Sequence, residues 1–296
     1  MTSFQDFFIL ATSIIVGSAP FILLGTLLSV LLQNYASQSF LLKILPKHSH
    51  TRRFVLSLFG ILLPVCECGN VPLARGLVVR GISPADATVF LLAAPIVNPI
   101  TIVTTYQVFG WENGILIARI LGGLAIANLI AWLFSLKADQ STLLTSEFNA
   151  TCRHSHGSHE KTSHPTRIAV DFTNELIRMF KPLIIGAGIA GAIQILVPRE
   201  VLSTIGNNPV LSVIVMLFLA IIISICSTVD SFFALSFAST FLPGAIVAFL
   251  VAGPLIDIRM IALLKTTYTA KSIALIVGVV LLSSFILAQV VNLLVV

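Results

Sequence analysis

Two cysteines and a glutamate stand together in an otherwise apolar stretch, LLPVCECGNVPLARG, at residues 62–76. Thiolates bind soft ions such as Cu(I) and Zn(II) and also thiophilic metalloids, whereas hard cations prefer cages of oxygen atoms. Cys66 and Cys68, with Cys226 later in the chain, therefore favour a soft solute as their ligand. Each thiol taken alone could instead be a small buried hydrophobe, because free cysteine is among the most buried residue types.

Acidic and polar side chains accompany these cysteines. Glu67 and Asn70 lie beside the first two thiols, and Ser227 and Asp230 follow the third. Ionisable side chains inside a membrane are costly and usually functional, so they favour a ligand or pathway role for the whole group. Glu67 and Asp230 would either tune thiolate formation or carry protons, and the sequence does not choose between these roles.

A second polar pair, Asn98 and Asp257, follows two apolar segments that contain proline, APIVN and GPLID. These residues could line the same solute path, and Asp257 is a third candidate for carrying a proton. They could equally cap helices at a kink, because Asn and Asp satisfy backbone groups that proline frees. Both interpretations stay open.

Arg119 lies shortly after the start of an apolar run. We expect its side chain to snorkel to the nearer membrane interface. The alternative is an ion pair with an acid in the membrane, such as Glu112 or Asp257. Arg119 is therefore left out of the candidate site.

The chain that carries these residues is very apolar, because 57% of its 296 residues are hydrophobic, 10% are charged and the mean hydropathy is +1.03. A typical soluble domain is about a quarter charged. Several runs reach the roughly 20 apolar residues that a spanning helix needs, which predicts an all-α integral membrane protein and not a barrel. The run 7–32 has no basic start and no clear cleavage site, so we expect a retained first span. In a membrane protein the Lys and Arg residues mostly indicate its orientation. The net charge of +5 therefore does not predict a nucleic-acid partner.

The chain also repeats itself. PADATVFLLAAPIVNP (84–99) aligns with PGAIVAFLVAGPLIDI (243–258) at an offset of 159 residues, and Cys66 aligns with Cys226 at an offset of 160. Pro20 faces Pro182 at an offset of 162. We therefore predict a first transmembrane repeat at 1–136, a linker at 137–171 and a second transmembrane repeat at 172–296.

Each repeat is expected to hold three full spans and one re-entrant hairpin of two short, broken helices. The full spans are 7–32, 86–109 and 114–136 in the first repeat, and 174–197, 244–265 and 273–295 in the second. The short apolar pieces on either side of each cysteine motif, CECGN at 66–70 and CSTVD at 226–230, are mostly too short to cross about 30 Å of hydrocarbon. Three crossings per repeat are an odd number, so the repeats should be inverted.

The basic residues agree with this topology. When the N-terminus is outside, the loop Lys and Arg residues fall on the cytoplasmic side, with Arg199 as the clear exception. Inverted repeats with broken helices are the architecture of secondary transporters, whose binding sites lie near the membrane midplane. The two cysteine motifs should meet there.

The linker contains a cluster of metal-binding residue types, CRHSHGSHEKTSH (152–164), with four of the six histidines of the chain. Such clusters bind Zn, Cu or Ni without the fixed spacing of a folded zinc site. The linker is expected to be cytoplasmic and flexible. It could collect or sense metal, or it could be a solvated connection in which histidine has no special role. The candidate ligands are Cys152, His154, His156, His159 and His164.

The stretch PVCECGNVPLARGLVVRGISPADATVFLLAAPIVNP, together with CSTVDSFFALSFASTFLPGAIVAFLVAGPLID, resembles the signature of the ArsP-like family of predicted permeases. The resemblance implies efflux of trivalent organoarsenicals such as methylarsenite, with membrane cysteines as ligands. It makes Cys66 and Cys68 motif positions and Cys226 their partner in the second half. The histidine-rich linker is outside the shared pattern. For this reason a metal ion stays an alternative substrate.

We therefore predict a permease of the inner (plasma) membrane, not an enzyme, that exports a soft thiol-reactive solute by alternating access. The first alternative is a transporter of a soft metal ion or another sulfur-seeking solute. The second is a membrane thiol redox or metal-sensing module, although a CxxC motif would be more typical of it. The sequence has no GxxxxGK[ST] loop for ATP, and no cofactor is expected. Assembly into a homo-oligomer is left open.

Overall fold

The computed structural model describes residues 3–35, 45–46, 48–62, 67–111, 114–157, 165–196, 208–238 and 240–295. Within these ranges the regular elements are helices, and the only strand-like feature is one isolated bridge between Leu144 and Tyr268. The predicted all-α class is therefore confirmed. The helices are α1 (Ser3–Tyr35), α3 (Ser49–Leu58), η1 (Phe59–Ile61), α4 (Glu67–Val79), α5 (Pro84–Val97), α6 (Pro99–Phe109), α7 (Ile115–Ser135), η2 (Gln140–Leu143), α8 (Ser146–Gly157), α9 (Pro165–Leu196), α11 (Leu211–Ile223), α12 (Asp230–Leu235), α13 (Pro243–Leu255), α14 (Ile258–Leu264) and α15 (Ala270–Val295).

Four helical stretches of the described chain are long and apolar enough to cross a membrane. They are Pro84–Phe109, Ile115–Ser135, Pro243–Leu264 and Ala270–Leu294, with 21 to 26 residues each. At 1.5 Å per residue even the shortest spans about 30 Å of hydrocarbon. They coincide with the later pair of spans expected in each repeat, so the chain is an integral membrane protein.

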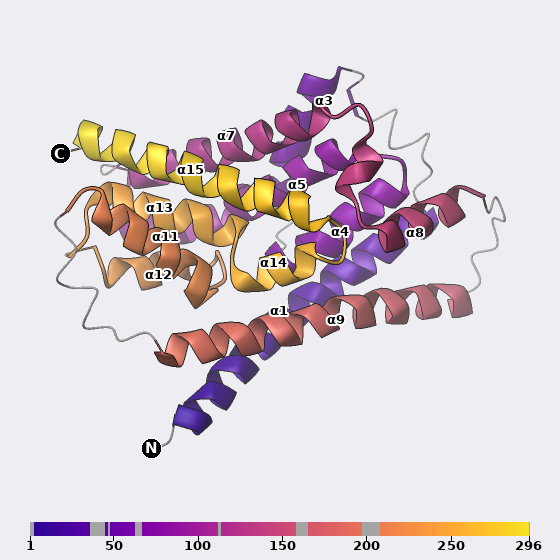
Figure 1. The fold of residues 1–296 in the computed structure, drawn as a ribbon, viewed down its shortest axis with the longest axis horizontal. Coiled ribbons are helices and arrows are strands. Elements are labelled where there is room, and N and C mark those ends of the chain that lie inside the picture. The colour runs from indigo at the N-terminus through magenta and orange to yellow at the C-terminus, as the bar shows by residue number, and fades with distance from the viewer. Residues whose placement is uncertain are drawn as a thin grey trace.

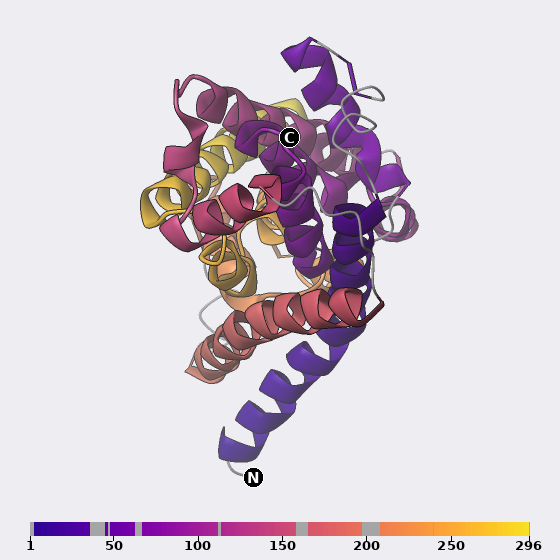
Figure 2. The same cartoon turned by 90° about the vertical axis from the view of Figure 1, so that its right-hand side faces the viewer.

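α1 and α9, which contain the first span expected in each repeat, have 33 and 32 residues, and α1 includes the apolar stretch Ile15–Leu31. The two helices cross one another along one side of the molecule, and the remaining helices form a bundle on the other side (Figures 1 and 2).

Two of the spans are broken at proline-rich points. Asn98 ends α5 and begins α6, where its side chain accepts a hydrogen bond of 3.0 Å from the Ile100 amide. Asp257 begins α14 and accepts from the Met260 amide. Because Asn and Asp side chains replace lost backbone partners at helix starts, both residues are helix caps, as one of the two interpretations predicted.

Short helices lie on both sides of each cysteine motif, and the predicted re-entrant hairpins require such short helices. α4 has 13 residues and α12 has six, so neither spans the roughly 30 Å of a bilayer core. Every residue of α4 is buried. α4 packs on α1, α5 and α14, and α12 packs on α6 and α13.

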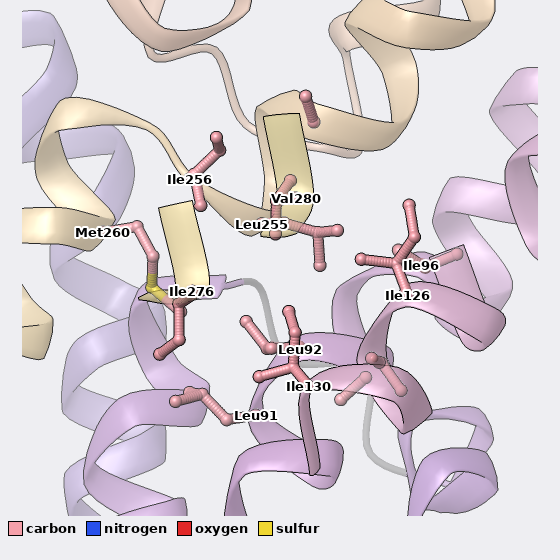
Figure 3. Close-up of a cluster of buried hydrophobic side chains, with 14 of the residues drawn as sticks. Leu91, Leu92, Ile96, Ile126, Ile130, Leu255, Ile256, Met260, Ile276 and Val280 are labelled. Atoms are coloured by element: carbon pink, nitrogen blue, oxygen red, sulfur yellow. The ribbon is translucent and has the colours of Figure 1, made fainter. Parts of the chain in front are cut away.

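The centre of the bundle is an apolar cluster between α5, α7, α13 and α15 (Figure 3). α5 packs on α7, α13 packs on α15, and α7 also contacts both α13 and α15. Branched aliphatic side chains fill the space between them and give the polar side chains described below a rigid support. Ten residues of the core, nine of them branched and one Met260 of α14, are Leu91, Leu92, Ile96, Ile126, Ile130, Leu255, Ile256, Met260, Ile276 and Val280.

The described part of the linker is folded and packed, in contrast to the flexible connection expected. Residues 140–143 and 146–157 are helical, and α9 begins at Pro165, before the expected boundary at 172. The ring of Phe148 is buried and lies 4.3 Å from the guanidinium of Arg75. The backbone of Thr145 also donates to Thr267 O at 3.0 Å. These contacts attach α8 to α4 and to the loop before α15.

Candidate functional site

The acids of the two cysteine motifs, Glu67 and Asp230, lie on the short helices α4 and α12. Their side chains are buried, with exposed fractions of 1% and 2%. Buried carboxylates need charged or hydrogen-bonding partners, since an isolated charge in an apolar interior is very costly. Both acids have such partners, and the partners of each acid include an arginine.

Glu67 is paired with Arg259 of α14, which lies beside α4 (Figure 1). Nη2 of Arg259 is 3.3 Å from Oε1 of Glu67. The same guanidinium is shared with Asp257, because Nε and Nη2 each lie 2.9 Å from Oδ2 of Asp257. One buried cation therefore serves two carboxylates.

Asp230 is paired more closely with Arg119 of α7. Nη2 of Arg119 lies 2.6 Å from Oδ2 and Nη1 lies 2.9 Å from Oδ1, which makes a two-pronged ion pair. Nη1 also donates to the hydroxyls of Thr105 at 2.8 Å and Ser231 at 2.9 Å. Arg119 is 1% exposed, so it does not snorkel as expected. It pairs with an acid of the membrane interior, Asp230, which was not one of the two partners considered from the sequence, and Glu112 lies outside the described residues.

A direct contact joins the two cysteine motifs. Oγ of Ser227 donates to Oε2 of Glu67 at 3.2 Å, although the two residues are 160 positions apart. This is the offset that aligns Cys66 with Cys226. The motifs therefore meet in space, as predicted.

The two described cysteines of the motifs lie beside the contact between Glu67 and Ser227, because Cys68 follows Glu67 and Cys226 precedes Ser227. Cys68 is buried and Cys226 is half-buried. Both lie near enough to Glu67 to interact with it electrostatically, and Cys226 also interacts with Asp230. The Thr228 hydroxyl lies 3.4 Å from the sulfur of Cys226. Cys66 lies outside the described residues.

Asn70 stands one helical turn after Glu67 and is completely buried. Neither its amide nitrogen nor its amide oxygen has a hydrogen-bond partner in the described structure. Thr26 of α1 and Thr101 of α6 are likewise buried with unpartnered hydroxyls. Buried polar groups are nearly always satisfied, so these atoms are available to a polar group that enters the site.

The structure describes the metal-binding candidates of the linker only in part. Cys152 lies on α8, where burial raises the pKa of its thiol and the neighbouring Arg75 opposes that shift. The backbones of His154 and His156 belong to α8, while their side chains, with His159 and His164, lie outside the description. Among the described residues no three His, Cys, Asp or Glu side chains are grouped to hold a metal ion.

The sequence reasoning did not include Arg259, Thr105 or Ser231 and excluded Arg119. The number of acids in apolar segments could have indicated the two arginines. Three acids in such segments require cations at a similar depth in the membrane. Arg119 and Arg259 are basic residues inside two apolar stretches long enough to span. Thr105 and Ser231 carry no comparable signal, since small hydroxyl residues are common in membrane helices.

A helical membrane protein whose broken helices surround buried charged and unpartnered polar groups has the construction of a membrane transporter. The chain belongs to the ArsP-type family of predicted permeases, whose model matches residues 3–293.

Its relatives include UPF0718 protein YcgR of Bacillus subtilis, which is 37% identical over 279 residues and covers 92% of this chain and 93% of the relative. A Streptococcus mutans protein, named as a candidate subunit of a two-component membrane permease complex, is 33% identical over 90% of this chain and 88% of its own. UPF0718 protein YraQ of Escherichia coli is 31% identical over 110 residues, which are 37% of this chain and 31% of its own. No solved structure matches the chain.

Proposed function

We propose that this permease exports a soft, thiol-reactive solute across the inner membrane, and that the solute is a trivalent organoarsenical such as methylarsenite. The observation that carries the proposal is the hydrogen bond from Ser227, the neighbour of Cys226, to Glu67, the neighbour of Cys68, which brings the two cysteine motifs together. Thiolates are the preferred ligands of soft metalloids. Cys66 precedes Glu67 in the same motif and is the third candidate thiol, of which methylarsenite would bind two at a time.

The exporter would work by alternating access between two inverted repeats. The contact of Ser227 with Glu67 across 160 residues supports this arrangement, because equivalent positions of two copies touch only near the axis that relates them. Matching helix pairs support it as well, since α3 packs on α5 as α11 packs on α13, and α5 packs on α7 as α13 packs on α15. In this topology the linker lies in the cytoplasm.

Release of the solute requires that the sulfur ligands separate. Methylarsenite keeps its methyl group and exchanges its two hydroxyls, which leave as water, for two thiolates, so a site whose two thiols lay on one helix would retain it. Cys68 belongs to α4 and Cys226 precedes α12. A movement of one hairpin helix relative to the other would therefore break the ligand set. Glu67 and Asp230 would tune thiolate formation or carry protons, and Asn70, Asn98, Ser227 and Asp257 would line or support the path.

Two other functions remain as proposals of lower rank. A soft metal ion could use the same thiols, and the histidine-rich linker favours that substrate. A thiol redox or metal-sensing module would use the CxC motif for exchange, and a mixed disulfide trapped on Cys66 or Cys68 would support it. Because a relative is named as part of a two-component complex, a second subunit is a candidate partner beside a second copy of this chain.

The test is uptake of methylarsenite into everted membrane vesicles, with Zn(II) and Cu(I) as competitors. We expect Cys66→Ser, Cys68→Ser and Cys226→Ser each to abolish uptake. Cys152→Ser is the matched control, because this thiol lies on α8 and outside the motifs. Normal uptake by all three variants, or no uptake by the wild type, would overturn the arsenical proposal. Competition by a metal would move the substrate to a soft metal ion.

A further inference from the structure

Asn70 and Asp230 occupy equivalent positions of the two cysteine motifs. Each is the last residue of its motif, CECGN or CSTVD, and they are 160 residues apart, the same offset at which Ser227 hydrogen-bonds Glu67. Both side chains are buried, with exposed fractions of 0% and 2%. The same place in each half of the chain thus holds a buried polar side chain.

The two side chains differ in whether the protein satisfies them. Asp230 accepts hydrogen bonds from Arg119 at 2.6 and 2.9 Å and a further one from the Ser231 hydroxyl at 3.2 Å. Neither the amide nitrogen nor the amide oxygen of Asn70 has a partner in the described structure. Buried polar groups nearly always have a partner, and an unsatisfied one destabilises the protein. The unpartnered amide of Asn70 is therefore the position of the two that a ligand can satisfy.

Asn70 is close to the contact that joins the two motifs. Residues three apart on a helix share a face, so Asn70 lies on the same face of α4 as Glu67. Glu67 accepts a hydrogen bond from Ser227, and Cys226 directly precedes Ser227. A solute attached to the sulfur of Cys226 thus enters the region one helical turn from Asn70.

The chemistry of the amide selects the kind of group that it binds. A side-chain amide offers two donors at its nitrogen and an acceptor at its oxygen. A cation would engage only the oxygen, and an anion would engage only the N–H groups. A hydroxyl group both donates and accepts, and it brings no charge into the apolar interior. The unpartnered amide therefore fits an uncharged hydroxyl group.

We propose that Asn70 is a specificity-determining residue that binds an arsenic-bound hydroxyl of the solute while the arsenic is attached to Cys226. This role rests on the proposed function and names the part of the solute that the site recognises. In this step methylarsenite exchanges one hydroxyl for the sulfur of Cys226. An arsenic–sulfur bond forms, an arsenic–oxygen bond breaks, and the hydroxyl leaves with the thiol proton as water. The second hydroxyl stays on the arsenic and hydrogen-bonds Asn70 until a second motif thiol displaces it as water.

Equilibrium binding to the purified, lipid-embedded full chain tests this role, with serine in place of Cys66, Cys68 and Cys152. Cys226 is then the only cysteine, so bound methylarsenite keeps one hydroxyl. Dimethylarsenite has a single hydroxyl, loses it on binding the thiol and has none left for Asn70. We expect Asn70→Leu to weaken methylarsenite binding about tenfold, the effect of losing one hydrogen bond. Dimethylarsenite binding should be unchanged or tighter.

The stability of the solute-free protein gives a second readout. Asn70→Leu removes polar atoms that have no partner, so it should leave the thermal unfolding midpoint unchanged or raise it. Asn292→Leu is the matched control, because Asn292 is a buried asparagine whose oxygen accepts from the Gly244 amide at 2.8 Å. It should lower the midpoint and change the binding of neither solute.

Unchanged binding of methylarsenite by Asn70→Leu would overturn the proposal, and a lower midpoint with it would show that Asn70 holds only an ordered water. Equal weakening for the two solutes would overturn it as well, because Asn70 would then position Cys226 and not bind a hydroxyl. Asn70→Ala covers the case in which leucine does not fit. Its smaller side chain removes the amide without a clash and should give the same contrast between the solutes.

Two results separate the hydroxyl contact from the arsenical substrate. If the wild type binds neither arsenical, the proposed function fails and the role of Asn70 fails with it. If the wild type binds methylarsenite but the chain that keeps only Cys226 does not, the proposed function stands and the attachment to Cys226 beside Asn70 is overturned.

Discussion

Ser227 and Glu67 stand 160 residues apart in the chain and share a hydrogen bond of 3.2 Å. Ser227 belongs to the motif CSTVD and Glu67 to the motif CECGN, and the same offset aligns their first cysteines. The Glu67 carboxylate thus accepts hydrogen bonds from two groups in the second half of the chain. These are the Ser227 hydroxyl and the Arg259 guanidinium of α14. Four testable consequences follow from this arrangement and its supports.

Cysteines introduced at these two positions should be joined by a short thiol-to-thiol cross-linker. The variant combines Glu67→Cys and Ser227→Cys with serine at the native cysteines and carries a protease site within 158–164. We expect the two halves to stay together on a denaturing gel after cleavage. Glu67→Cys with Leu235→Cys is the control, because Leu235 is exposed on α12. Separation of the halves in the first variant would contradict the contact.

Loss of Arg119 should destabilise the protein more than loss of an arginine that is only partly buried. Arg119→Gln leaves Asp230 as an uncompensated buried charge, which costs about 3–5 kcal/mol. The double variant Arg119→Met, Asp230→Leu should recover most of that loss, since apolar replacement of a buried pair is often neutral. Arg52→Gln is the comparison, because Arg53 also pairs with Asp86.

The measurement is the thermal unfolding midpoint of each variant in detergent. If Arg119→Gln and Arg52→Gln lower it equally, then the Arg119–Asp230 pair is weaker than its geometry implies.

A side chain on Gly25 should separate α1 from α4. A Cβ at this position would overlap the backbone of Gly69, directly before the unpartnered Asn70. Gly25→Ala should therefore cost about 1–3 kcal/mol of stability through overpacking. Gly17→Ala on the same helix meets nothing within 4 Å and should be neutral or stabilising by up to about 1 kcal/mol. Equal unfolding midpoints for the two variants would contradict the close approach of the helices.

Alkaline pH should weaken the attachment of the linker through Tyr268. Burial raises the pKa of Tyr268 to about 12, and its hydroxyl lies 2.9 Å from that of Thr88. Because the unfolded chain ionises near pH 10 and the folded one near pH 12, this contribution to stability is complete below pH 10. It is lost as the pH rises from about 10 to about 12.

The check is the fall in unfolding midpoint between pH 9 and pH 11 for the wild type and for Tyr268→Phe. The variant should lose less stability over this interval, although it starts lower because the hydrogen bond to Thr88 is gone. Tyr106→Phe is the control, since Tyr106 is exposed on α6. The same pH dependence in all three proteins would show that folding does not raise the pKa of Tyr268.

Much of the architecture follows from the sequence alone, because membrane helices depend on local composition. Apolar runs of sufficient length must form helices in lipid, where every backbone group needs an internal partner. The spans 86–109, 114–136, 244–265 and 273–295 were therefore predicted close to their observed bounds. The helix breaks at Asn98 and Asp257 also follow from local chemistry, since proline and short polar side chains favour capping.

The partners of the charged residues were decided by tertiary structure. Arg119 has Glu112 as a near neighbour in sequence, yet it pairs with Asp230, which is 111 residues away. Which acid faces which arginine depends on how the helices pack, and hydrophobic packing is not directional. Composition indicates that acids in apolar segments need cations, but only the packing of α14 on α4 and of α7 near α12 assigns each arginine to its carboxylate. The sequence by itself thus determined the helices and the residues of the cysteine motifs, and the tertiary structure decided how the charges between them are paired.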